Sequence, residues 1–443
     1  MQARPMGVAA LAGLALLITS CSAGDSSPEG PVEVTALLIG YPDEDGIDAT
    51  TGLPRPGIAN LEKAFNDAHD DIRLDIINIP WGEGSTGYAA KTEAMIQAAE
   101  ACLYEMPGYA DYGRRGFLVD LNTMIDADPD FENVWGEQLK AAETVDGELF
   151  YLPSNTGIRV INWDAKLFED WGVEPLSKNP TPDEVLEKAA ELTGVNPVTG
   201  EQNYGYWYQG KYAVWQFLAI AHAMGADWGR VNPDGTMEID WNTPEYLEAL
   251  EWFVDAAQYA PDGALSSDAM PEGFLTDQNV VAIIPEGEAG YFLQSFVAEP
   301  DLANRYRTSF NFKGDDGLGG LNSVTPVAMA DECDHKEQAW EALKWLAGSD
   351  ESQKYYYDSL GRLPATEDGA AALPEVAALT DGDVILEQSL TAEATYPWAS
   401  QDPRWAMQTA LEGALAGTLT PEQALEQAQA ETELWLADQG LAP

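Results

Sequence analysis

The segment Leu149–Phe168, LFYLPSNTGIRVINWDAKLF, constrains the fold of this chain more than any other stretch. Its composition predicts a strand over Phe150–Leu152, a polar break over Pro153–Gly157, and a β-branched run that turns into a helix. An alternating strand and helix pattern precedes the segment, and a mostly helical block follows it. The segment therefore predicts a crossing from one lobe to a second, with Asn155 and Thr156 near the cleft between them. The alternative is an ordinary loop inside one large domain.

The chain before this segment predicts a parallel sheet. Strand-like runs alternate with helical patterns in the order Val32–Tyr41, Ile58–Ala68, Ile72–Trp81, Tyr88–Ala101 and Cys102–Met106. This order places the strands parallel and covers them with helices. The length of 443 residues exceeds one ordinary core, which also favours two lobes.

The carboxyl ends of these strands are the expected place for a ligand site, as in other open α/β sheets. The rule places four residues there: Tyr41, Trp81, Glu105 and Tyr109. The aromatic side chains offer flat faces, and the glutamate can bind hydroxyl groups, so the set suits a sugar.

An aromatic run between Tyr204 and Trp215 supplies further candidates in the second block. Part of the run is expected to pack in a core. The rest, with Trp207 and Tyr208 as candidates, would present ring faces to a sugar at the cleft. Glu286, near the end of a predicted strand, is another candidate ligand-binding residue.

The charge balance excludes some classes of partner. The chain has 75 acidic and 22 basic residues and a formal net charge of −53. Such a protein repels nucleic acid and anionic membrane surfaces, so no nucleic-acid partner is expected. The acidic loop that holds Asp43, Asp45 and Asp48 lacks the closing glutamate of an EF-hand, so a solvated loop is favoured over a calcium site.

The amino terminus has the pattern of an export signal. Residues 1–21 contain one early arginine, an apolar run over Val8–Ile18, and the sequence Ile-Thr-Ser-Cys ending at Cys21, which resembles a bacterial lipobox. The resemblance implies cleavage before Cys21, lipidation of that cysteine, and a flexible tether over residues 22–31. No later stretch is long and apolar enough to predict a membrane span, so the lipid would be the sole membrane attachment.

Two cysteines remain beyond the signal, Cys102 and Cys333. An exported protein permits a disulfide between them, and two free buried thiols are the alternative. Two distant cysteines and three scattered histidines do not form a zinc site, so no metal is expected.

No catalytic pattern is present in the sequence. It lacks a G-x-S-x-G elbow, a Walker loop and an H-E-x-x-H helix. Residues Gly82–Gly87 match G-x-G-x-x-G, but they follow the second predicted strand instead of the first, so a cleft-edge loop is favoured over a dinucleotide site. The sequence therefore predicts a binding protein without a cofactor, not an enzyme.

The order of several loose motifs resembles the sugar-type family of bacterial extracellular solute-binding proteins, which serve ABC importers. The motifs are the lipobox, GFLVDL from Gly116, LPSNTG from Leu152, EQAW from Glu337 and GRLP from Gly361. One departure is Ala101-Cys102, where the family usually has Pro-Asp.

The resemblance implies an α/β, two-lobed periplasmic-binding-protein-like fold of type II, with a ligand cleft between lobes joined by crossing strands. It places residues 32–155 and about 322–365 in lobe 1, and residues 156–321 and about 366–443 in lobe 2. It adds ligand-binding candidates at positions where the family has aromatic or small residues: Tyr291, Gly319, Gly320, Trp398 and Trp405.

The same resemblance implies a monomer, lipid-anchored at the outer face of the cell membrane or in the periplasm, that delivers ligand to the transmembrane subunits of an ABC permease. The expected ligand is a neutral sugar or oligosaccharide, because basic residues are sparse. A cationic ligand such as a polyamine is the alternative within binding proteins. An exported glycoside-acting enzyme is the alternative of another class.

Overall fold

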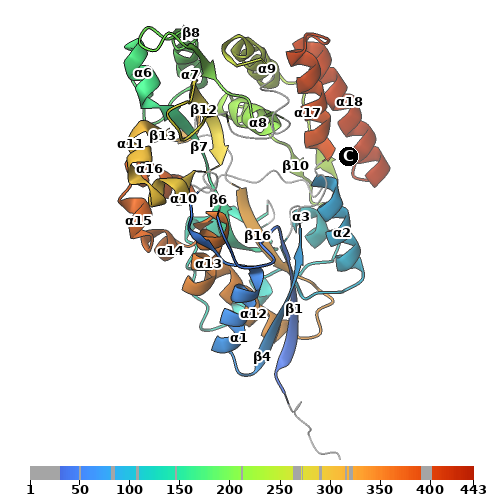
Figure 1. Ribbon diagram of the computed structural model, residues 1–443. Coiled ribbons are helices and arrows are strands. Elements are labelled where there is room, and N and C mark those ends of the chain that lie inside the picture. Colours follow the sequence, from blue (N-terminus) through green and yellow to red (C-terminus); the bar gives the residue numbers. More distant parts are fainter. Residues whose placement is uncertain are drawn as a thin grey trace, which may run out of the picture.

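The protein contains two large β-sheets, each flanked by helices (Figure 1). The structure is a computed structural model that describes residues 30–443 except 49–50, 81–84, 106–108, 145–146, 211–212, 263–270, 272, 289–291, 315–316, 319–322 and 391–401. We call the part built on the six-stranded sheet the six-stranded lobe and the part built on the five-stranded sheet the five-stranded lobe. They lie at the bottom and the top of Figure 1. This architecture agrees with the predicted two-lobed α/β class.

The six-stranded sheet has the order β17-β6-β16-β5-β1-β4. Its strands are β1 Val32–Ile39, β4 Ile72–Ile79, β5 Leu103–Glu105, β6 Leu152–Gly157, β16 Ser323–Met329 and β17 Leu363–Pro364. β1 pairs in parallel with β4 and β5, so the predicted parallel arrangement of these three strands is confirmed. β16 is antiparallel to both β5 and β6. The sheet as a whole is therefore mixed, and the carboxyl ends of β1, β5 and β6 lie at one edge.

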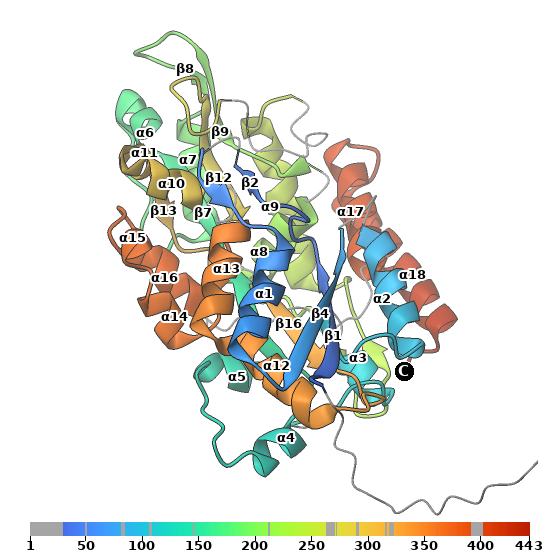
Figure 2. The same cartoon turned by 60° about the horizontal axis from the view of Figure 1, so that its bottom comes forward.

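Helices from both ends of the chain flank this sheet. They are α1 Ile58–Ala68, α2 Ser85–Gln97, α3 Tyr109–Arg114, α4 Asn122–Ala127, α5 Glu137–Ala141, α12 Lys336–Gly348 and α13 Asp350–Leu360, with a small hairpin of β2 Gly46–Ile47 and β3 Pro54–Arg55. α1 buries Leu61 and Phe65, one helical turn apart, and packs beside α13 (Figure 2).

The five-stranded sheet has the order β13-β7-β12-β9-β8. Its strands are β7 Arg159–Asp164, β8 Gly194–Val195, β9 Gln202–Tyr206, β12 Val281–Glu288 and β13 Tyr306–Ser309. β12 is parallel to β9 and antiparallel to β7. The amino end of β7 therefore lies at the same edge as the carboxyl ends of β9 and β12. Two small hairpins join this lobe: β10 Arg230–Val231 with β11 Met237–Glu238, and β14 Lys313–Gly314 with β15 Gly317–Leu318.

The remaining helices belong mainly to the five-stranded lobe. They are α6 Ala165–Trp171, α7 Pro182–Glu191, α8 Ala213–Ala223, α9 Pro244–Ala256, α10 Leu293–Ala298, α11 Pro300–Arg305, α14 Glu367–Ala371, α15 Pro374–Ala377, α16 Gly382–Leu390, α17 Asp402–Leu415 and α18 Pro421–Gln439. α17 and α18 pair with each other and pack on α8 and α9, whereas α14–α16 lie on the opposite side of the molecule (Figure 2).

The predicted polar break at the crossing is wrong. Residues Leu152–Gly157 form β6, in which all six residues are buried, and the strand predicted over Phe150–Leu152 is displaced into them. β6 lies between two antiparallel neighbours, β16 and β17, so its backbone groups are paired on both sides. Its polar side chains also find partners, such as Ser154 Oγ donating to Thr325 O at 3.0 Å. Polar residues can therefore form a central strand here.

Helix-capping signals in the sequence match the observed helix ends. Thr420 followed by Pro421 predicts the start of a helix, and α18 begins there. The Thr420 side chain accepts from Gln423 N, the Gln423 side chain accepts from Thr420 N, and Pro421 occupies the first helical position. Asp164 caps α6 by accepting a hydrogen bond from Lys166 N at 3.0 Å. Among the described helices, none has both the length and the apolar composition needed to cross a membrane.

Buried side chains form three clusters. One fills the five-stranded lobe around α8 and α9, and a second fills the six-stranded lobe around β1 and α12. A third cluster surrounds the crossing and includes Ile158, Val160, Leu293, Val376 and Ile385. In the second cluster a disulfide joins Cys102 to Cys333, with Cα atoms 4.9 Å apart.

Candidate functional site

The two lobes meet at the residue that joins their sheets. Ile158 alone separates β6 from β7. β6 ends at the edge that holds the carboxyl ends of β1 and β5, and β7 begins at the edge that holds the carboxyl ends of β9 and β12. In open α/β sheets, ligands bind at the edge formed by the carboxyl ends of parallel strands. The edges of this kind in the two lobes therefore meet at the crossing.

Three of the predicted rim residues come together on the six-stranded side. Asn155 Nδ2 donates to the Tyr41 hydroxyl at 3.5 Å, and Asn155 Oδ1 accepts from Thr325 Oγ1 at 2.8 Å. Glu105, the last residue of β5, accepts from the Ile39 N–H through Oε2 at 3.4 Å. All three predicted residues are at least nine-tenths buried, so they form an internal polar cluster at this edge.

Burial dominates the electrostatics of this cluster. It raises the pKa of Glu105 to about 8, against the opposing effects of hydrogen bonds from Ile39 and Tyr41 and of the Arg362 charge. Burial likewise raises the pKa of Tyr41 well above its usual value. The Glu105 carboxyl group therefore carries a proton at neutral pH, and the cluster is largely uncharged despite the acidity of the chain.

Two aromatic rings pack beside Tyr41 in this polar cluster. The Tyr41 ring lies 5.9 Å from that of Tyr355 and 5.8 Å from that of Tyr356, both on α13. Tyr109, at the start of α3, contacts Tyr151 in a tilted arrangement, with the ring centres 4.0 Å apart. Thr156, the other predicted residue of β6, is fully buried.

A loop after β9 forms the corresponding edge of the five-stranded lobe. Gln216 on α8 accepts from Gln209 N at 3.0 Å and donates to Trp207 O at 3.0 Å and to Pro285 O at 2.9 Å. This one buried amide fixes the loop against α8 and β12. Tyr208 packs edge-on against Phe253 and donates its hydroxyl to Phe253 O, so the structure gives this candidate a packing role.

Two arginines lie over one indole ring at this edge. The Arg159 guanidinium carbon is 5.4 Å from the centre of the Trp215 ring, and that of Arg404 is 4.3 Å from it. Arg404 also lies 4.7 Å from the ring of Trp405, a predicted ligand residue. Arg159 Nη1 donates to Gln209 Oε1 at 3.5 Å, which connects this cluster to the loop after β9.

Arg159, Arg404, Gln209 and Gln216 were not predicted from the sequence. Two signals were present: Arg159 lies inside the crossing motif and Arg404 directly precedes Trp405, in a chain with 22 basic residues. The partners are far apart in sequence, so their juxtaposition requires the fold.

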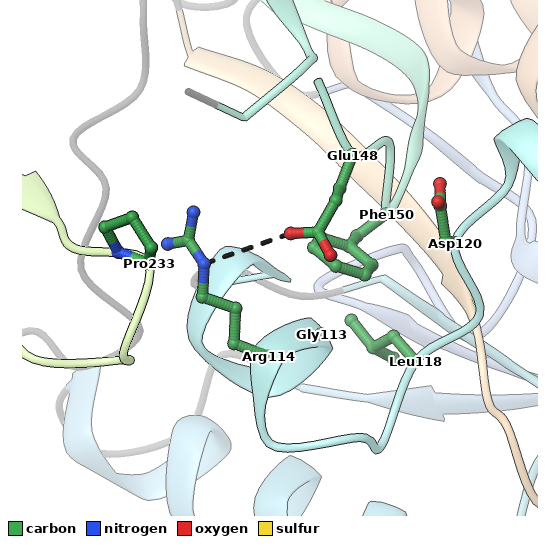
Figure 3. A pocket seen from close by; sticks show the side chains of 7 residues that line it. All are labelled: Gly113, Arg114, Leu118, Asp120, Glu148, Phe150 and Pro233. Atoms are coloured by element: carbon green, nitrogen blue, oxygen red, sulfur yellow. Dashed lines mark ion pairs between the residues drawn. The ribbon is translucent and has the colours of Figure 1, made fainter. Parts of the chain in front are cut away.

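A cavity of about 560 Å³ opens where α3 of the six-stranded lobe meets the β10–β11 hairpin (Figure 3). Its lining residues are Gly113, Arg114, Leu118, Asp120, Glu148, Phe150 and Pro233. Arg114 lies between Glu148 and Pro233, with Nε 3.9 Å from Glu148 Oε2 and Nη1 donating to Val231 O at 3.3 Å. The second bond connects the two lobes.

Gly113 is required for the shape of this cavity. A Cβ at this position would lie 2.5 Å from the Phe150 ring, so a larger residue would push α3 away from the cavity wall.

Several predictions fall outside the described residues. They concern Cys21, Trp81, Tyr291, Gly319, Gly320, Trp398 and the first half of the Gly82–Gly87 loop, and the side chain of Glu286 is not described either. The second half of that loop, from Ser85, forms the start of α2. Within the described part of the chain, no group of three histidine, cysteine or acidic side chains is placed to hold a metal ion.

Comparisons with known proteins identify the family to which this chain belongs. A family model described as bacterial extracellular solute-binding protein matches residues 51–353. The chain is similar to the structure of the ABC substrate-binding protein Lmo0181 from Listeria monocytogenes in complex with cycloalternan, with 21% identity over 92% of this chain and 99% of that chain and a TM-score of 0.68.

Two further solved structures have the same architecture. The cyclic alpha-maltosyl-1,6-maltose binding protein from Arthrobacter globiformis is 21% identical over 92% of this chain and 100% of that chain, with a TM-score of 0.66. Maltose-bound MalE3 from T. maritima is 18% identical over 91% of this chain and 100% of that chain, with a TM-score of 0.65. These structural matches confirm the fold, and the family model covers more than half of the sequence. The chain therefore belongs to the family of bacterial extracellular solute-binding proteins, which are non-enzymatic components of ABC transporters.

Proposed function

We propose that this protein captures a sugar or oligosaccharide between its two lobes and delivers it to the permease of an ABC importer. The observation that carries the proposal is the convergence of the ligand-binding edges of both sheets at Ile158, with polar and aromatic side chains on each side. Relatives of the same fold support it, since their structures hold cycloalternan and maltose.

The side chains at the two edges suit saccharides in kind. Asn155, Gln209 and the protonated Glu105 offer hydrogen-bond donors and acceptors, while Trp405 offers an aromatic ring. The cavity beside Arg114 has the volume usual for small-ligand sites and lies between the lobes. Closure of the lobes follows if the ligand binds the closed form more tightly than the open form.

The same proposal covers export and domain organisation. Lipidation of Cys21 and the tether over residues 22–31 hold the protein at the outer face of the membrane as a monomer. The expected division gives lobe 1 residues 32–155 and about 322–365, and lobe 2 residues 156–321 and about 366–443. We move the first boundary to Gly157, where β6 of the six-stranded sheet ends. Metabolic labelling with a radioactive fatty acid tests the anchor: label is expected in the full chain and not in a Cys21→Ala variant.

A thermal-shift screen of residues 22–443 against mono- and oligosaccharides, polyamines and sugar phosphates tests the ligand class. A ligand that binds only the folded state raises the melting temperature as its concentration rises. A shift with a saccharide that is recovered unchanged supports the proposal. A shift with polyamines alone refutes the sugar assignment, and hydrolysis of the bound saccharide refutes the transport role.

A further inference from the structure

One hydrogen bond joins the two lobes away from the crossing. Arg114, the last residue of α3, donates through Nη1 to Val231 O on β10 at 3.3 Å. α3 packs in the second cluster through Tyr112, and Val231 belongs to the first cluster. Figure 1 places α3 and β10 on the right of the molecule and α10 and α16, which contribute to the third cluster, on the left. The bond therefore spans the lobes at a distance from the crossing.

Other hydrogen bonds between the lobes lie at the crossing itself. Gln294 on α10 donates to Tyr357 O on α13 at 2.9 Å. Leu293 and Tyr357 both belong to the third cluster, which also contains Ile158. When two bodies rotate about a hinge, contacts at the hinge change little, whereas contacts far from it separate. Bending at Ile158 that opens the lobes would therefore break the bond from Arg114.

The β10–β11 hairpin presents the Val231 carbonyl group outward. Asn232 N donates to Thr236 O, so these two residues form a hydrogen-bonded pair. Such pairs alternate with non-hydrogen-bonded pairs in antiparallel strands, so the next pair, Val231 with Met237, directs its backbone groups away from the hairpin. Met237 N donates to Leu441 O, which fixes the β11 edge to its own lobe. The β10 edge is left to present the Val231 carbonyl to α3 of the other lobe.

The six-stranded lobe holds the Arg114 guanidinium group in position for this contact. The side chain is 7% exposed, and Nε lies 3.9 Å from Glu148 Oε2 of the same lobe (Figure 3). Gly113 lets α3 approach the Phe150 ring closely, which fixes the helix on its sheet. A charged donor makes a stronger hydrogen bond than a neutral one. Because the donor is already placed, little side-chain entropy is lost when the bond forms.

We propose that Arg114 is a positioning residue that latches the lobes in the closed form through the Val231 carbonyl, and so sets the ligand affinity. This inference rests on the proposed capture of ligand between the lobes and adds a residue that controls it. The apparent dissociation constant rises as the closed fraction of the ligand-free protein falls. Loss of the latch therefore weakens every ligand by the same factor. Loss of a ligand contact weakens different ligands by different factors.

Pulsed electron–electron double resonance between two spin labels measures the closed fraction without ligand. Residues 22–443 contain two cysteines, which are joined to each other, so introduced cysteines take the labels selectively. Lys91→Cys on α2 and Glu426→Cys on α18 place exposed labels on the two lobes, on the same side of the molecule as α3 (Figure 2). We expect a short-distance population in the ligand-free protein. Arg114→Gln should lower its ratio to the long-distance population roughly 10-fold.

Isothermal titration then measures the effect on affinity, with maltose, maltotriose, cellobiose and any further saccharide that raises the melting temperature. Arg114→Gln should weaken each bound saccharide by one common factor, roughly 3- to 10-fold. Arg114→Lys keeps a charged donor for the single carbonyl and should recover most of the loss. Glu148→Gln holds Arg114 less firmly and should weaken binding roughly twofold. Arg230→Gln, a control whose arginine pairs with Glu238 inside its own hairpin, should change neither affinity nor label distance.

The outcomes separate the latch from the transport role. If saccharides bind and Arg114→Gln changes neither affinity nor label distance, the latch is overturned and the proposed function stands. A loss that differs between saccharides, with the label distance unchanged, also overturns the latch and makes Arg114 a ligand contact. If no saccharide binds, the proposed function is overturned, and the label distances still decide the latch. Glu148→Gln, which leaves Arg114 in place, decides the question if Arg114→Gln does not fold.

Discussion

Substitution of Glu105 by glutamine should remove a large part of the pH dependence of stability. The pKa of Glu105 rises from 4.5 to about 8 on folding because the carboxyl group is buried at the end of β5. A shift of this size corresponds to about 5 kcal/mol between the two protonation states. Few other groups titrate in this pH range, because the chain has only three histidines.

The sign follows from proton binding. Between pH 4.5 and about 8 the folded state retains a proton that the unfolded state has lost, so the free energy of unfolding falls as pH rises. The stabilising contribution is complete below pH 4.5 and is lost as pH rises through about 8. Wild-type protein should therefore lose about 3 kcal/mol between pH 5 and pH 7.5. Glu105→Gln stays neutral and retains an acceptor for the Ile39 N–H, so its stability should change little over this range.

Urea denaturation followed by tryptophan fluorescence, at constant ionic strength and at half-unit steps from pH 5 to pH 9, provides the measurement. Glu33→Gln is the matched control, because Glu33 is an exposed glutamate on the neighbouring strand β1. It should retain the wild-type slope. If wild-type stability is flat between pH 5 and pH 7.5, or if Glu105→Gln keeps the same slope, Glu105 is not buried as a neutral acid and the reasoning fails.

Three further perturbations follow from buried contacts. Arg305 lies 2.9 Å from the Asp164 carboxylate, whose side chain is 1% exposed. Arg305→Met removes this partner and should lower the free energy of unfolding by about 3–5 kcal/mol. The control Arg230→Met breaks an exposed ion pair and should lower it by less than about 1 kcal/mol. Cys102→Ser with Cys333→Ser opens a disulfide that spans 231 residues and should cost about 2–5 kcal/mol, and residues 22–443 should show no free thiol before reduction. Gln216→Leu removes three hydrogen bonds from the loop after β9 and should cost about 2–3 kcal/mol and weaken ligand binding. Gln427→Leu removes only an exposed hydrogen bond to Glu431 on α18 and should do neither. Equal denaturation midpoints for the Gln216 and Gln427 variants would contradict the role given to Gln216.

Local signals predicted much of the fold. Runs of apolar residues identified β1, β4 and β5, and their alternation with helices gave the parallel pairing. Thr420 with Pro421 marked the start of the last helix. The prediction failed at β6 because its residues Pro153, Asn155 and Gly157 have low strand preference, and the pairing that stabilises the strand comes from β16 and β17, about 170 and 210 residues later.

The residues of the candidate site also fall into a group that the sequence predicted and a group that it did not. The rule that ligands bind at the carboxyl ends of parallel strands placed Tyr41 and Glu105 at one edge of the sheet. This rule needs only the direction of each strand. The cluster of Arg159, Trp215 and Arg404 depends on three elements separated by up to 245 positions, and no local pattern encodes their meeting.

The crossing has a mechanical consequence. β6, Ile158 and β7 make one extended segment of 13 residues, about 43 Å long at the usual rise of a strand. Bending between the lobes at this crossing would change the backbone angles at Ile158, whose side chain is packed in the third cluster with Val376 and Ile385. We expect the stiffness of this joint to depend on how tightly those methyl groups fill their space. A cavity made in this cluster, for example by Val376→Ala, would change the balance of open and closed forms and therefore the ligand affinity. Natural selection on transport can therefore act on core residues that do not contact the ligand.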